Sequence, residues 1–113
     1  MVSQSYIGRA LTAHSIAIPR ELQREDFDAL LSEIGFERPA ESVFERYVEA
    51  LNRRYPSRLV IPFAKAISSD DTAGIVVQDG RVIEFHDFAE QGFEQPKYFL
   101  DIASWLAAHR TTA

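Results

Sequence analysis

Two adjacent carboxylates, Asp70 and Asp71, lie between two apolar segments and directly follow Ser68 and Ser69. Neighbouring carboxylates can bind a cation or receive the basic side chains of a partner protein. The same residue types also form ordinary solvated turns, because Asp and Ser side chains hydrogen-bond to their own backbone. The residue types therefore leave a binding site and a plain turn both open.

His86 and Asp87 form a second group that could act as a base or as metal ligands. Neighbouring residues on a strand point to opposite faces, so we expect no His–Asp dyad while the strand lasts. His14 and His109 lack the spacing that would complete a three-ligand site with His86, and zinc needs three or four convergent ligands. We therefore expect no metal and no cofactor, with Asp87 bonding loop amides and His86 partly exposed.

Several aromatic residues crowd one acidic segment near the end of the chain: Phe88, Phe93, Tyr98 and Phe99. Tyr and Phe are enriched at the centres of protein interfaces. The alternative is that these rings tuck under the loop and cover a sheet edge. Both remain open for Phe93, whereas Phe99 is expected inside. Tyr98 is expected at a rim, with its ring packed and its hydroxyl in water.

The sequence contains none of the common catalytic motifs. It has no nucleophile elbow, no glycine-rich phosphate loop and no helical His-Glu metal motif. The absence of cysteine excludes disulfides and thiolate metal ligands. We therefore expect a protein that is not an enzyme.

Apolar spacing predicts the elements that must position these residues. Apolar residues recur at helical spacing over residues 21–34, and Gly35 suits the end of that helix because glycine accepts the left-handed conformation. The same spacing predicts a second helix over residues 40–55, with Pro56 as its breaker. Residues 16–18 alternate in polarity and predict a short strand.

The pattern then changes to that of a sheet. Residues 58–63 are apolar and partly β-branched, which indicates a strand. Residues 72–78 and 81–88 flank Asp79 and Gly80, a pair typical of two-residue hairpin turns in which both positions have positive φ. We expect these two segments to pair antiparallel.

Alternation along the second hairpin arm assigns its faces. Ile83 and Phe85 should point to the core, and Glu84 should point away from it. A closing helix is expected from about Asp101, which is a candidate N-cap, and its spacing places Trp105 in the core. The chain is thus predicted to be a single α+β domain over residues 1–113, a largely antiparallel sheet with two N-terminal helices and one C-terminal helix packed on it.

The order of several short motifs over the second half resembles the SUKH superfamily, the Smi/Knr-like domains. The motifs are Ile61-Pro62-Phe63-Ala64, Asp70-Asp71, Asp79-Gly80, His86-Asp87-Phe88-Ala89 and Trp105-Leu106. Such domains are α+β and often serve as bacterial immunity proteins against toxins. The resemblance implies that the acidic turn opens the central strand and borders a groove.

Charge and hydropathy limit the classes of partner. The chain has 17 acidic and 12 basic residues, a formal charge of -5. Such a surface repels phosphate backbones and suits a basic protein partner, although mild acidity also simply aids solubility. No apolar run approaches the roughly 20 residues that span a bilayer, and the first residues do not resemble a secretory leader. We expect a soluble cytoplasmic protein without membrane or nucleic-acid contacts.

These observations favour a non-enzymatic binding protein, an immunity-type domain that occludes the active site of a cognate toxin. The alternatives are a ligand-binding or regulatory scaffold of the same fold, and a small hydrolase that uses His86. The predicted partner contacts are Asp70, Asp71, Glu84, Asp87, Glu90, Phe93 and Tyr98.

Overall fold

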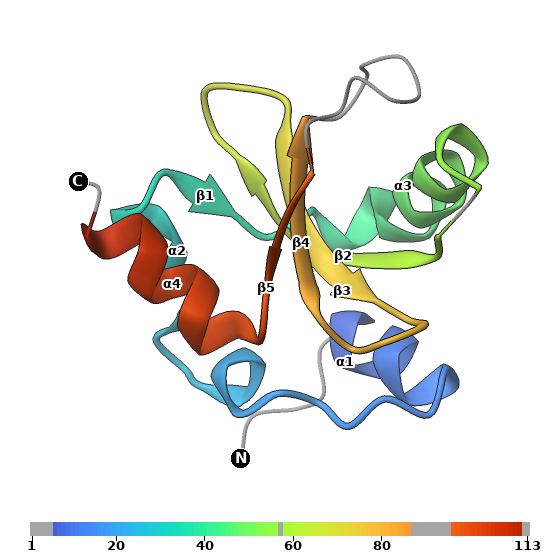
Figure 1. Cartoon of the computed structure of the whole chain (residues 1–113), viewed down its shortest axis with the longest axis horizontal. Coiled ribbons are helices and arrows are strands. Elements are labelled where there is room, and N and C mark those ends of the chain that lie inside the picture. Colours follow the sequence, from blue (N-terminus) through green and yellow to red (C-terminus); the bar gives the residue numbers. More distant parts are fainter. Residues whose placement is uncertain (1–5, 57, 87–95, 112–113) are drawn as a thin grey trace.

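A five-stranded antiparallel sheet with the order β1-β2-β3-β4-β5 lies at the centre of the fold (Figure 1). The computed structural model describes residues 6–56, 58–86 and 96–111. The strands are β1 (Phe36–Glu37), β2 (Val60–Ala66), β3 (Asp71–Val76), β4 (Val82–His86) and β5 (Lys97–Phe99). Each strand pairs with the next one along the chain, so this sheet contains no crossover.

Helices cover both faces of the sheet (Figure 1). They are α1 (Tyr6–Ala13), the 3₁₀ helix η1 (Arg20–Gln23), α2 (Phe27–Glu33), α3 (Glu41–Arg54) and α4 (Ile102–Thr111). This arrangement confirms the predicted α+β class. None of the helices in the described ranges has the length and apolar content needed to cross a membrane.

Two apolar clusters account for the burial of the sheet. The larger one joins α1, α2 and α4 to one face, and Trp105 at its centre is fully buried, as predicted. The Trp105 ring packs edge-on against Phe36 and Phe63, at centroid distances of 5.1 and 5.2 Å. The smaller cluster joins the second half of α3 to the other face, where Leu51 packs with Phe85 and its neighbours. The central strands are therefore covered on both sides.

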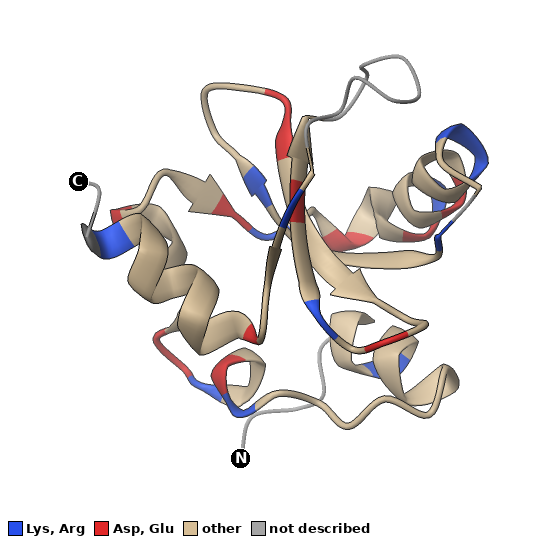
Figure 2. Ribbon diagram, viewed as in Figure 1, with Lys and Arg blue, Asp and Glu red and all other residues tan. Residues whose placement is uncertain are grey.

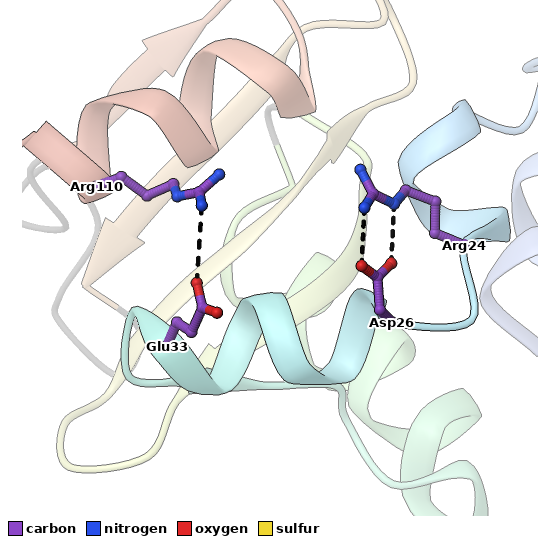
Figure 3. A network of polar contacts seen from close by, with 4 residues as sticks. All are labelled: Arg24, Asp26, Glu33 and Arg110. Carbon is purple, nitrogen blue, oxygen red and sulfur yellow. Dashed lines mark hydrogen bonds and ion pairs between the residues drawn. The ribbon is translucent and has the colours of Figure 1, made fainter.

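The predicted long helix over residues 21–34 is wrong in its first half. The 3₁₀ helix ends at Gln23, the backbone of Arg24 is extended, and α2 begins only at Phe27. Arg24 and Asp26 form a bidentate ion pair across this break, with both nitrogen–oxygen distances at 2.8 Å (Figure 3). At the other end of α2, Glu33 pairs with Arg110 of α4 at 3.9 Å (Figure 3). Both pairs are exposed, and such pairs add little stability.

The predicted hairpin forms, but not through a two-residue turn. The strand β3 ends at Val76, and residues 77–80 separate Val76 from Arg81. The backbone N–H of Val76 donates to the carbonyl of Arg81. Gly80 has the positive φ of 76°, whereas Asp79 does not. The Asp79 carboxylate instead accepts from the backbone N–H of Arg81 at 2.9 Å and pairs with its guanidinium, which lowers the pKa of Asp79.

The predicted strand at residues 16–18 does not form. These residues connect α1 to η1 and lie outside the sheet, with Ile16 and Ile18 partly buried against the larger cluster. The helix α1 and the short strands β1 and β5 were not predicted. The segment containing β5 was expected to be a loop, because three residues are too few to establish an alternating pattern.

A side chain takes the place of a neighbouring strand at the start of β2. Asn52 of α3 accepts from the Val60 N–H at 2.8 Å and donates to the Val60 carbonyl at 3.1 Å. Its amide nitrogen also donates to the Val48 carbonyl at 2.8 Å. Asn52 thereby joins α3 to the sheet through hydrogen bonds that a strand would otherwise supply.

Gly74 marks a close approach between β3 and β2. It lies opposite Pro62, beside the irregularity in the register between Pro62 and Ala64. A Cβ atom on Gly74 would stand 2.5 Å from Val60 Cγ1 and 2.8 Å from the Ile61 carbonyl oxygen. The backbone oxygen belongs to the sheet ladder and has little room to move, so this position requires glycine.

We expect Gly74→Ala to lower the free energy of unfolding by about 1–3 kcal/mol, because overpacking forces the backbone to shift. Urea denaturation measures the change. The matched control is Gly8→Ala in α1, whose added Cβ has as its nearest neighbours atoms of the Ile18 side chain, with Cδ1 at 3.0 Å. Alanine is favoured over glycine inside a helix by roughly 0.5–1 kcal/mol, so the control should lose little or gain. An unchanged urea midpoint for Gly74→Ala would contradict the close approach.

Asp101 is the predicted cap of α4. Its Oδ1 accepts from the Ser104 N–H at 2.8 Å, and this hydrogen bond lowers the pKa of Asp101. A lowered folded-state pKa stabilises the protein above the unfolded pKa of about 3.9 and ceases to do so as the pH falls through the folded value.

We therefore expect Asp101→Ala to melt at a lower temperature than wild type at pH 6, and the gap to narrow in acid below about pH 4. Melting curves of both proteins, recorded from pH 6 down to below about pH 4, measure the difference in melting temperature. Asp101→Asn is the control, because asparagine also caps helices but does not titrate. A constant gap across this pH range would show that the Asp101 carboxylate does not act as an ionised cap.

Candidate binding site

The predicted acidic turn connects β2 to β3. Asp70 is exposed, and Asp71 is half-buried as the first residue of β3. The backbone N–H of Asp71 donates to Ser69 Oγ at 3.3 Å, as in an ordinary turn. Acidic residues at this turn, and basic ones at the carboxyl end of α3, are visible along the ribbon in Figure 2.

Asp71 also contacts His86, as the register of the sheet requires. These residues lie directly opposite each other on β3 and β4, and Asp71 Oδ1 is 2.9 Å from His86 Nδ1. His86 is exposed, in line with its predicted position. The sequence analysis considered only the neighbouring Asp87 as a partner. Counting the pairs outward from a two-residue turn at Asp79-Gly80 places His86 opposite Ala73, whereas the longer connection in the structure shifts the register and places His86 opposite Asp71.

A cavity of about 400 Å³ opens beside the acidic turn. We call it the acidic-turn groove and define it by Val43 and Tyr47 of α3, Lys65 and Thr72 of the sheet, and Ile67 and Asp70 of the β2–β3 connection. Residues 37–40, from the last residue of β1 to the residue before α3, also line it. The groove thus lies between the first half of α3 and the sheet.

The position of the groove follows from how α3 packs. The second half of α3 rests on the sheet through Leu51, and Tyr55, directly after the helix, belongs to the same smaller cluster. One helical turn before Leu51, the Tyr47 hydroxyl is hydrogen-bonded to Thr72 Oγ1 at 2.6 Å. At this position the contact between α3 and the sheet is therefore polar rather than apolar. Beyond that bond two large apolar side chains are exposed, Val43 at 42% and Ile67 at 58%.

Only some of the charged groups that line the groove form ion pairs within the described residues. Arg38 donates to both oxygens of Asp28, at 2.6 and 2.8 Å, and this pairing raises its pKa. Glu37, Lys65 and Asp70 form no ion pair with any residue in the described ranges. Within the described part of the chain, the rim therefore presents carboxylates without an ion pair, and Lys65 on the sheet also has none.

The predicted orientation of Glu84, one of the expected partner contacts, is wrong. It was expected to face away from the core and to meet a partner, but it is only 8% exposed. Its Oε1 accepts from Trp105 Nε1 at 2.8 Å and also contacts His109 Nε2. The prediction is wrong because α4 covers the face of the sheet that alternation had assigned to solvent.

One further predicted contact, Tyr98, is not among the residues that line the groove. Tyr98 lies on the edge strand β5, is 43% exposed, and carries the Arg81 guanidinium 4.3 Å above its ring centre. Asp87, Glu90 and Phe93 lie outside the described residues. The structure therefore brings Asp70 and Asp71 to the groove and leaves Tyr98 on a separate edge.

Within the described residues, no group of three or more His, Asp or Glu side chains is placed to hold a metal ion. Comparisons with protein families, with curated proteins and with solved structures found no match to this chain.

The buried Glu84 generates a testable prediction. Glu84→Ala leaves the Trp105 indole N–H buried without this acceptor, so we expect a loss of about 1–3 kcal/mol in unfolding free energy. Urea denaturation measures the loss. Lys97→Ala is the control, because Lys97 lies opposite Glu84 on β5 and is exposed. Exposed substitutions usually stay within about 0.5 kcal/mol. Equal losses in both variants would contradict the assigned role of Glu84.

Proposed function

We propose that this chain is a non-enzymatic protein-binding domain that neutralises a bacterial toxin by covering its active site. The observation that supports the proposal is the acidic-turn groove, where an exposed Asp70, with no ion pair to any residue that the structure describes, lies beside exposed Val43 and Ile67. The resemblance of the sequence motifs to SUKH domains supports the immunity-type role and a cytoplasmic location.

The groove combines the features that protein interfaces require. Interfaces bind through a central apolar anchor surrounded by a polar rim. Val43 and Ile67 supply apolar surface from two different elements, and Asp70 and Glu37 supply the rim. A volume of about 400 Å³ is large enough to receive side chains of a partner.

Occlusion requires no chemistry from this chain. A toxin that acts on nucleic acid carries basic groups around its substrate site, because it must attract phosphates. An acidic inhibitor surface is drawn to those groups from a distance, which mainly accelerates association. The overall charge of -5 adds to the same attraction.

Two other functions remain candidates. A regulatory or ligand-binding scaffold of the same fold would use the same groove for a partner unrelated to toxins. A small hydrolase is favoured by one observation, the exposed His86 held by Asp71 at 2.9 Å, because a carboxylate-oriented histidine suits a general base. Turnover of a substrate panel that His86→Ala abolishes would support the hydrolase and exclude the binding-only proposal.

The direct test is affinity capture of the partner from the organism that encodes this chain, followed by a toxicity assay. Recovery of one protein whose toxicity this chain suppresses supports the immunity role. Recovery of a regulator without toxicity supports the scaffold instead.

Binding kinetics with the recovered partner test the role of the acidic turn. We expect Asp70→Lys to slow association several-fold, and the wild-type association rate to fall with added salt, because exposed charges are screened over about 8–10 Å near physiological ionic strength. Surface-based kinetics at two salt concentrations measure both effects.

Glu25→Lys is the matched control, because it makes the same charge change at an exposed position between η1 and α2. Equal slowing by both variants would show that only the net charge matters. Unchanged rates for Asp70→Lys would place the interface elsewhere.

A further inference from the structure

The inner face of α3 continues beyond the part of the sheet that it covers. Val43, Tyr47 and Leu51 follow each other at four-residue spacing, so they share one stripe of the helix. Leu51 is buried in the smaller cluster, Tyr47 is half-buried at Thr72, and Val43 is 42% exposed. The stripe therefore ends in one apolar position that no described residue of the sheet covers.

Most of the sheet residues that line the groove with Val43 are polar, whereas those that pack against the second half of α3 are apolar. Lys65 and Thr72 are cross-strand neighbours on β2 and β3, and both line the groove. Ile67 adds a second exposed apolar side chain to the groove from the connection after β2. Two apolar side chains on different elements thus line one cavity of about 400 Å³. That space fits a few side chains of an extended segment and is too small for a folded domain.

The charged residues that line the groove indicate whether a bound segment should be acidic or basic. Asp70 and Glu37 are carboxylates without an ion pair among the described residues, and Asp28 already neutralises Arg38. An acidic segment would meet both rim carboxylates, whereas a basic side chain gains a partner at Asp70. Lys65 on the sheet wall repels a second cation, so the cation belongs at the rim and an uncharged side chain within.

We propose that the acidic-turn groove binds an extended basic segment of the partner protein, with an apolar side chain between Val43 and Ile67 and a lysine or arginine at Asp70. This inference rests on the proposed binding function and specifies the chemistry of the partner segment.

The test uses a phage-displayed library of random eight-residue peptides, selected on the full chain. The enriched peptides are then labelled, and their binding is measured by fluorescence anisotropy. We expect them to contain a lysine or arginine near an apolar residue. Val43→Ser, Ile67→Ser and Asp70→Lys should each weaken binding about tenfold or more, which corresponds to about 1.4 kcal/mol.

Two controls lie outside the groove. Leu100→Ser removes an apolar side chain that is 75% exposed after β5, and Glu25→Lys repeats the charge change. Both should bind the peptides as wild type does, and melting curves verify that every variant folds. Failure to enrich peptides, enrichment of acidic ones, or equal effects of groove and control variants would overturn the inference.

The captured partner separates this inference from the proposed function. A partner that binds Val43→Ser and Ile67→Ser as tightly as wild type would overturn the groove occupant while leaving the binding function intact. Absence of any toxic partner, together with groove-specific peptide binding, would overturn the immunity role and retain the occupant.

Discussion

One buried carboxylate oxygen links the middle of the sheet to the last helix. Glu84 Oε1 accepts from Trp105 and contacts His109, so two residues one turn apart on α4 are tied to β4. This fixes the rotation of α4 and presents the Trp105 ring to Phe36 on β1 and Phe63 on β2. Burying a carboxylate is costly unless hydrogen bonds satisfy it, which explains why its two partners come from the helix it must hold.

The groove on the opposite face follows from an imbalance between the two layers. One face is covered by α1, α2 and α4, whereas α3 serves the other face through its second half. The first half of α3 leans toward α1 instead, where Phe44 packs edge-on against Tyr6 at 5.0 Å. A single helix shared between two neighbours leaves an open wedge beside the sheet. The candidate site is thus a product of helix packing, and the acidic turn happens to border it.

Periodicity in the sequence predicted the elements that were long enough to show it. The helix α3, the start of α4 at the Asp101 cap and the pairing of β3 with β4 were all anticipated. The two-residue β1 and three-residue β5 carry too little pattern to detect. The burial of Glu84 was missed because alternation separates two faces without revealing how many of them a helix covers. The groove depends on contacts between distant segments, so only Asp70 and Asp71 on its rim were anticipated.

The Asn52 side chain, which bonds the edge of β2 where a strand could otherwise pair, has a consequence for aggregation. The central strands carry apolar residues on both faces, and such segments readily template cross-β fibrils when their edges are free. The edges described here are a two-residue strand, a three-residue strand bearing Lys97, and a β2 start whose Val60 amide and carbonyl are occupied by Asn52. A side-chain amide thus protects the start of β2 from edge-to-edge pairing with another chain without lengthening the sheet.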